Sequence, residues 1–83
     1  MTNVYRFQCR AVCPIHAELI DVYDVEVRAS VTIPVERILE VFAPYEKRQI
    51  FQEFMTQEAA VALGASVSTT GIHSGVEVIS YAP

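Results

Sequence analysis

Two stretches of strict alternation between apolar and polar residues constrain the fold of this chain most strongly. In the first stretch the apolar positions are Tyr5, Phe7, Cys9, Ala11 and Cys13. In the second they are Tyr23, Val25, Val27, Ala29, Val31 and Ile33. A period of two residues is typical of a β-strand that buries one face. The connection between the stretches is too short for a parallel crossover, so the sequence predicts an antiparallel hairpin.

A helix is predicted directly after the second strand. Pro34 suits a first helical turn, because its missing N–H would have no partner there. Apolar residues then recur at the helical spacing i, i+3, i+4, i+7, at Val35, Ile38, Leu39 and Phe42. Pro44 ends this helix, because proline cannot continue a helical interior.

A second helix is predicted over about residues 49–63, with Gly64 as its C-terminal cap. Its predicted apolar stripe consists of Ile50, Phe51, Phe54, Met55, Val61 and Ala62. Glu58 falls inside that stripe, where an unpaired carboxylate would be costly. We therefore expect Glu58 to be at least half buried and hydrogen-bonded, or to lie at a contact between subunits.

The last segment, residues 65–82, is predicted to form a second hairpin. Gly71 and Gly75 bracket a bend or bulge at Ile72-His73-Ser74. The sequence does not decide which set of alternating residues in 76–82 is buried, because both sets contain apolar side chains. The whole chain is thus predicted to be one α+β domain, residues 1–83, with the order strand–strand–helix–helix–strand–strand. Both helices would cover one face of an antiparallel sheet.

Composition limits the possible partners. A chain of 83 residues buries only about 60–65% of its unfolded surface, and 52% of these residues are hydrophobic, so we expect a homo-oligomer. The net charge of -4 and the scattered basic residues argue against nucleic-acid binding. No run of about 18 apolar residues predicts a membrane span. The N-terminal residues do not resemble a secretory signal, and with two cysteines this favours a reducing, cytoplasmic location.

Cys13 and His16 stand at a C-x-x-H spacing, from which both side chains can reach one metal ion. The alternative is a buried cysteine at a strand end and a surface histidine in a loop. Glu53 lies in the first turn of the second predicted helix, where an acidic side chain also commonly complements the helix dipole. His73 lies between glycines that would let a backbone approach a ligand, although glycines are ordinary turn residues as well.

Three segments occur in an order and spacing that match one protein family. Cys13-Pro14-Ile15-His16 resembles the Cys-Glu-His-His of GTP cyclohydrolase I, with its two zinc ligands at Cys13 and His16. Residues 51–56, Phe-Gln-Glu-Phe-Met-Thr, resemble the Gln-Glu-Arg-Leu-Thr that opens that enzyme's second helix. Residues 65–73 resemble the strand that leads to its catalytic histidine. GTP cyclohydrolase I, the pyruvoyl-tetrahydropterin synthases and the nitrile reductase of queuosine synthesis share the tunnelling fold, or T-fold, and the predicted element order resembles it.

The resemblance implies roles for individual residues. Glu53, with Gln52 before it, would bind a guanine or pterin ring, and His73 would be catalytic. Cys13-Pro14 also looks like the opening of the nitrile reductase motif, in which the cysteine is a nucleophile that forms a thioimide. That enzyme's aspartate is implied near Asp21, one position out of register.

The chain departs from the cyclohydrolase pattern at its metal site. The family's third zinc ligand, a cysteine, is Gly75 here, and one of the paired histidines is Ile15. We therefore expect no tightly bound zinc, and the departures leave open whether the chain is an enzyme.

The function that the sequence favours is a small T-fold-like homo-oligomer that binds a planar purine- or pterin-like ring at subunit interfaces. Glu53 and Gln52 would bind the ring, and Cys13, His16 and His73 would border the same pocket. The alternative is a non-catalytic protein that binds a partner, such as an inhibitor or an assembly factor. The acidic balance and the short length fit both functions.

Overall fold

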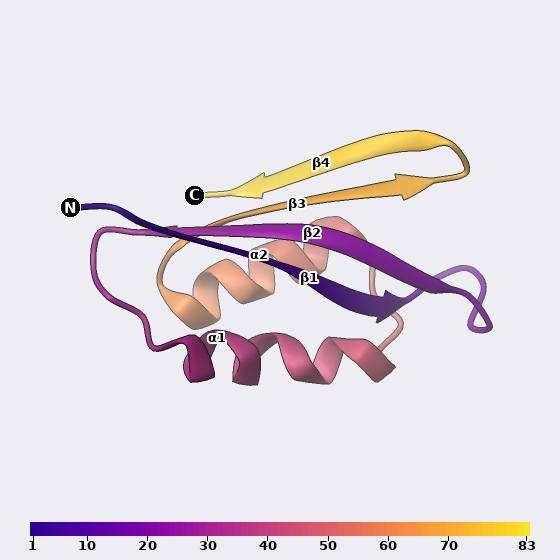
Figure 1. Ribbon diagram of the computed structural model, residues 1–83. Helices are drawn as coiled ribbons and strands as arrows, with labels where there is room; N and C mark the ends of the chain where they lie inside the picture. Colours follow the sequence, from indigo (N-terminus) through magenta and orange to yellow (C-terminus); the bar gives the residue numbers. More distant parts are fainter.

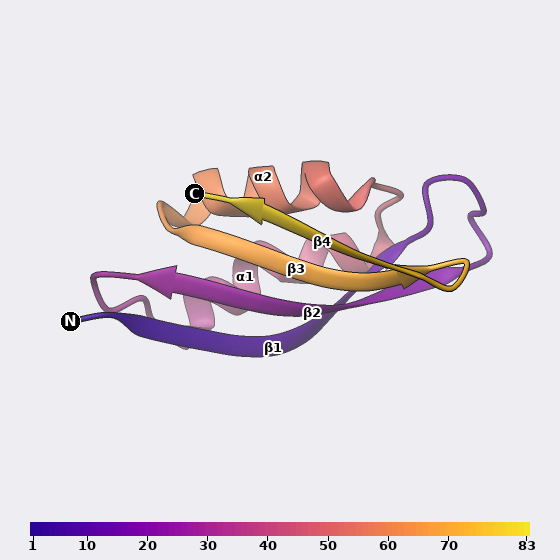
Figure 2. The same cartoon turned by 90° about the horizontal axis from the view of Figure 1, so that it is seen from above.

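The computed structural model describes residues 1–83, and its elements follow the predicted order. They are β1 (Asn3–Val12), β2 (Ile20–Ala29), α1 (Val35–Phe42), a 3-10 helix η1 (Ala43–Lys47), α2 (Gln52–Leu63), β3 (Ser66–His73) and β4 (Val76–Ala82). The four strands form one antiparallel sheet in the order β1-β2-β3-β4. Both helices lie on one face of this sheet, and the other face is uncovered (Figure 1). The predicted α+β fold class is confirmed. Figure 2 shows the strands side by side with the helices beyond them.

The first hairpin follows from the two alternating stretches. Strands β1 and β2 pair over ten positions, from Asn3 opposite Ala29 to Val12 opposite Ile20. This register places both apolar sets on the face that the helices cover, where Tyr23, Val25 and Val27 are almost fully buried.

The second strand is shorter at its end than predicted. It stops at Ala29 and does not continue to Ile33, and the side chain of Val31 is 62% exposed. The chain leaves the sheet here to reach the helical layer. Ile33 still enters the core, and its backbone N–H donates to the hydroxyl of Tyr5 at 2.9 Å.

The first helix buries half of its predicted stripe. Ile38 and Phe42 are buried, whereas Val35 and Leu39 are more than half exposed. Phe42 meets Phe7 of β1 edge to face, with ring centroids 5.0 Å apart. The predicted break after Phe42 is a change to the tighter η1 helix, with Pro44 in its first turn.

The predicted apolar stripe of α2 is wrong for most of its members. The residues that face the sheet are Gln52, Met55, Thr56, Ala59 and Ala60. Phe51 and Phe54 are about half exposed, and Val61 is 85% exposed. The small alanines allow the helix to lie close to the sheet, and Gln52 and Thr56 form hydrogen bonds with Thr69 of β3. The large apolar side chains of Phe51, Phe54 and Val61 point outward instead.

The second hairpin turns at Ser74-Gly75. Both residues have positive φ angles, 51° and 83°, which is the geometry of a type I′ turn. The predicted bend at Ile72-His73-Ser74 is therefore shifted, because His73 is the last residue of β3 and pairs with Val76. In β4 the alternate residues Val78, Ser80 and Ala82 lie on the side of the helices, and Ala82 is buried.

Residue 71 must be a glycine because the Tyr23 ring packs directly against its backbone. A Cβ atom at this position would lie 2.5 Å from Cδ1 and 2.6 Å from Cε1 of the Tyr23 ring. Real Cβ atoms do not come so close to another heavy atom, so only a glycine at position 71 leaves room for the Tyr23 ring over the sheet.

Candidate functional site

One end of the sheet gathers segments that are far apart in the sequence. The end of β1, the start of β2, the turn between β3 and β4 and the first turn of α2 all lie there (Figure 1). Backbone hydrogen bonds fix the entry to α2 against β1: Val12 N–H donates to Arg48 O at 3.0 Å, and Ile50 N–H donates to Val12 O at 3.4 Å. The Gln49 amide also donates to Cys13 O at 3.2 Å. This end therefore brings Cys13, Asp21, Gln52 and His73 into one region.

Cys13 and His16 form a tight turn, but they are not joined by further ligands. The backbone N–H of His16 donates to Cys13 Sγ at 3.4 Å. The imidazole of His16 is 60% exposed and faces Glu18, with Nδ1 3.7 Å from Oε1. No three side chains among His, Cys, Asp and Glu are arranged to hold a metal ion.

The metal prediction follows from this pair. Protein purified without added metal should contain far less than one zinc ion per chain, because two ligands are too few for a closed tetrahedral site. Atomic emission analysis of the dialysed protein measures the ratio. Stoichiometric zinc would contradict the prediction, and loss of that zinc in a Cys13→Ser variant would then assign the site.

His73 lies against Asp21 and Tyr23 of β2. The resemblance to the nitrile reductase implied an aspartate near Asp21, whereas no sequence pattern marked Tyr23. The Nδ1 atom of His73 is 3.9 Å from Asp21 Oδ1, and the centroid of its ring is 5.8 Å from that of Tyr23. The hydroxyl of Tyr23 donates to Asp21 Oδ2 at 3.3 Å. Burial, followed by the Asp21 carboxylate, raises the pKa of Tyr23 far above its usual value, with smaller effects from Cys9 and Cys13. Tyr23 therefore stays a neutral donor, beside a carboxylate, an imidazole and a thiol.

Gln52 occupies a different place from the predicted one. It was expected to bind the ligand, but its side chain points into the core and is only 4% exposed. Its amide nitrogen faces Thr69 O, Thr69 Oγ1 and Val78 O at 3.1, 3.1 and 2.9 Å. Its amide oxygen is 2.9 Å from His73 Nε2. The side chain is thus used within the chain, and it contacts a candidate catalytic residue directly.

Glu53 lies one residue further on and is exposed. Its carboxylate has no hydrogen-bond or ion-pair partner within the chain, so it is free to accept bonds from a ligand. Next to it Phe51 and Phe54 make an edge-to-face pair with ring centroids 6.1 Å apart, and both rings are partly exposed. The first turn of α2 therefore presents a free carboxylate among aromatic side chains.

Glu58 is hydrogen-bonded as expected, but it lies at the border of the exposed face and not in a buried stripe. Its two carboxylate oxygens accept bonds from the Arg48 guanidinium at 2.9 and 3.1 Å, and 44% of the Glu58 side chain is exposed. The guanidinium carbon also lies 5.8 Å from the centre of the Tyr45 ring. A pair this exposed contributes only about 0–1 kcal/mol to folding, and it connects the segment before α2 to the helix itself.

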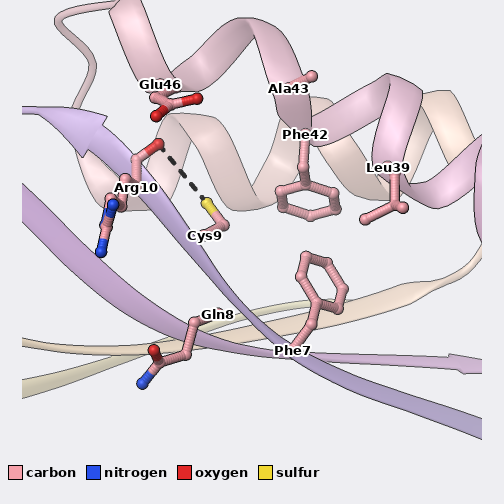
Figure 3. Close-up of a pocket in the computed structure, with 8 residues that line it drawn as sticks. All are labelled: Phe7, Gln8, Cys9, Arg10, Leu39, Phe42, Ala43 and Glu46. Carbon is pink, nitrogen blue, oxygen red and sulfur yellow. Dashed lines mark hydrogen bonds between the residues drawn. The ribbon is translucent and has the colours of Figure 1, made fainter.

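The main hollows of the surface do not enclose the candidate site. A groove of about 360 Å³ runs along the free edge of β1, between that strand and the α1–η1 layer (Figure 3). Phe7, Leu39 and Phe42 form its apolar part, and Glu46 lies at one end. A second hollow, of about 340 Å³, is lined by Asp21 together with Gly71 and Ile72 of β3. Cys13, Glu53 and His73 line neither of these two hollows.

Comparisons with known proteins agree with the fold. No protein family matches the sequence, and no curated protein resembles it closely enough to be matched. None of the helices is long and apolar enough to cross a membrane. Among solved structures, the archaeosine synthase QueF-Like in the apo form superimposes with a TM-score of 0.84, at 21% sequence identity. The match covers 98% of this chain and 90% of the synthase chain. The chain therefore shares the fold of the QueF-Like archaeosine synthase.

Proposed function

We propose that this chain is a homo-oligomeric tunnelling-fold protein that binds a planar purine- or pterin-like ring between subunits, with Glu53 as the anchor. The observation that carries the proposal is the exposed Glu53 carboxylate in the first turn of α2, directly after Gln52, whose side chain contacts His73. The structural neighbour is an archaeosine synthase, and this supports a purine-like ring as the ligand of the present chain.

The chemistry of Glu53 suits such a ring. The amidine-like edge of a guanine or pterin carries two parallel N–H donors, and a carboxylate can accept both at about 2.7–2.9 Å. Phe51 and Phe54 supply aromatic surface beside this carboxylate. Glu53 also lies in the first turn of α2, where the helix dipole makes a negatively charged side chain favourable.

A second copy would close the site. Large apolar side chains remain exposed in the single chain, among them Ile15, Phe51, Phe54 and Val61. Exposed apolar surface often marks a site where another protein molecule binds. The outer side of β4 is unpaired, and that of β1 is paired only at Val12, which is bridged to Gln49. Free strand edges are surfaces on which another strand can pair. Joining β1 of one copy to β4 of the next would remove both edges and cover the groove along β1.

Cys13 and His73 would supply the reactive groups if the bound ring carries an electrophilic nitrile. The Cys13 sulfur would form a bond to the nitrile carbon, one C–N π bond would break, and the thiol proton would reach the nitrogen by way of His73. The product is a thioimide, with atoms and electrons balanced. The supporting observation is the position of both residues at the same end of the sheet, with Asp21 beside His73.

The experiment that tests the anchor is calorimetric titration with guanine- and pterin-containing compounds. Glu53→Gln should weaken binding by at least about tenfold, because it replaces one acceptor oxygen by a donor. Glu36→Gln is the matched control, since Glu36 is an exposed acidic residue in the first turn of α1, and it should bind as the unmodified chain does. Equal affinity in Glu53→Gln and the unmodified protein would remove Glu53 from the site.

One observation favours a second function. The exposed Phe51–Phe54 pair on α2 would also suit a non-catalytic protein that docks on a partner protein, as an inhibitor or assembly factor does. The same titration separates the two, because a partner-binding protein would bind none of the purine or pterin compounds.

A further inference from the structure

The buried amide of Gln52 has one chemically sensible orientation. Its nitrogen faces two backbone carbonyl oxygens, Thr69 O and Val78 O, and such oxygens can only accept hydrogen bonds. Turning the amide over would place its oxygen against both carbonyl oxygens, and none of these three atoms could donate a hydrogen bond to another. The amide oxygen therefore points toward His73, at 2.9 Å from Nε2.

Two threonine hydroxyls support the same arrangement. The hydroxyl of Thr56 donates to the backbone oxygen of Gln52 at 2.8 Å, so its hydrogen is used. The 2.8 Å contact between the hydroxyls of Thr56 and Thr69 must then be donated by Thr69. This leaves the lone pairs of Thr69 Oγ1 for the Gln52 amide nitrogen at 3.1 Å. A single placement of hydrogens thus satisfies every member of the network, and no buried side-chain polar atom is left without a partner.

From this network we infer that Gln52 is a positioning residue that holds His73 as the Nε2–H tautomer. An amide oxygen carries no hydrogen, so Nε2 must donate across the contact with Gln52. In the neutral ring the lone pair then lies on Nδ1, the nitrogen that faces Asp21 at 3.9 Å. Nδ1 is therefore the atom at which His73 takes up or gives away a proton.

The position of Nδ1 gives this tautomer a use at the site. The groups that face it are Asp21 and Tyr23 of β2, and the Tyr23 hydroxyl is already committed to Asp21. A proton taken up at Nδ1 would face the Asp21 carboxylate. The role of Nδ1 toward a bound ring rests on the proposed function, whereas the tautomer rests only on the hydrogen bonds.

A two-bond ¹H–¹⁵N correlation spectrum of the imidazoles tests the tautomer directly, at a pH where the rings are neutral. His16 is the other histidine, and its exposed ring serves as the internal reference for a freely averaging imidazole. His73 should show a protonated Nε2 and a bare Nδ1, with the Nε2–H form in at least about tenfold excess. An Nδ1–H form, or averaging like that of His16, would overturn the inference.

Two variants test whether Gln52 is the cause. Gln52→Met removes the acceptor of Nε2–H and should reduce the tautomer excess at least about threefold, while Thr69→Val removes one hydroxyl and leaves the contact with His73 intact. An unchanged tautomer in folded Gln52→Met would contradict the positioning role, and so would loss of the tautomer in Thr69→Val. If Gln52→Met does not fold, the spectrum of the unmodified chain still decides. An Nε2–H tautomer in a chain that binds no purine or pterin would reject the proposed function and leave this inference standing.

Discussion

Alkylating reagents should modify Cys13 of the folded protein at least about 100-fold faster than Cys9. Burial raises the pKa of the Cys9 thiol to about 11 from 9.0, which lowers its thiolate fraction at neutral pH about 100-fold. Cys9 is also only 7% exposed, and its Sγ lies 3.8 Å from Met55 Sδ. Figure 3 shows the second contact of this sulfur, with Arg10 O at 3.9 Å. Cys13 is partly exposed at the end of β1. Mass spectrometry of iodoacetamide-treated protein measures both rates.

Serine variants provide the controls for this labelling. Cys13→Ser should abolish rapid labelling, Cys9→Ser should leave it unchanged, and unfolding should make both thiols reactive. Equal rates for the two cysteines in the folded chain would contradict the buried position of Cys9.

The raised pKa also sets a direction for the alkaline stability. The unfolded chain releases the Cys9 proton at lower pH than the folded chain does, so the free energy of unfolding should fall as pH rises from 9.0 toward about 11. The pKa of Tyr23 is raised as well and acts in the same direction.

Gln52→Met should lower the free energy of unfolding by about 3 kcal/mol. The substitution removes the hydrogen bonds from the Gln52 amide to the Thr69 hydroxyl and the Val78 carbonyl, and the contact with His73 Nε2. Each lost hydrogen bond contributes about 0.5–1.5 kcal/mol. Urea denaturation followed by circular dichroism measures the change.

Gln57→Met is the matched control for that experiment. Gln57 is exposed on the same helix, so its replacement should change stability by less than about 0.5 kcal/mol. A loss of similar size in both variants would show that the buried network adds nothing specific to folding.

The first hairpin could be predicted because alternation is a local property of the sequence, and the register of β1 and β2 follows from matching the two apolar sets. The bend of the second hairpin was predicted at Ile72-His73-Ser74, too early in the chain, because two glycines flank that segment and only Gly75 takes part in the turn. The buried face of α2 could not be predicted in this way. Its contacts depend on Gln52 and Thr56 finding polar partners in β3, which apolar periodicity does not register.

Some residues of the candidate site could likewise be predicted from the sequence, and others could not. The resemblance of short motifs pointed to Cys13, Glu53 and His73, because their spacing along the chain is visible in the sequence. The resemblance to the nitrile reductase implied an aspartate near Asp21, one position out of register, and the pairing of β2 with β3 brings Asp21 next to His73. Gln52 was assigned to the ligand because it precedes Glu53, but a helix turns by about 100° per residue, and this rotation sends it to the core.

The central claim is that a second copy completes a site for a purine- or pterin-like ring. Mass spectrometry under native conditions, at micromolar protein and with a guanine or pterin compound added, tests subunit number and ligand binding together. The account predicts a closed oligomer of identical chains that carries up to one ligand per subunit, and loss of the ligand, but not of the oligomer, in Glu53→Gln. A mass equal to one 9.3 kDa chain without ligand would contradict it.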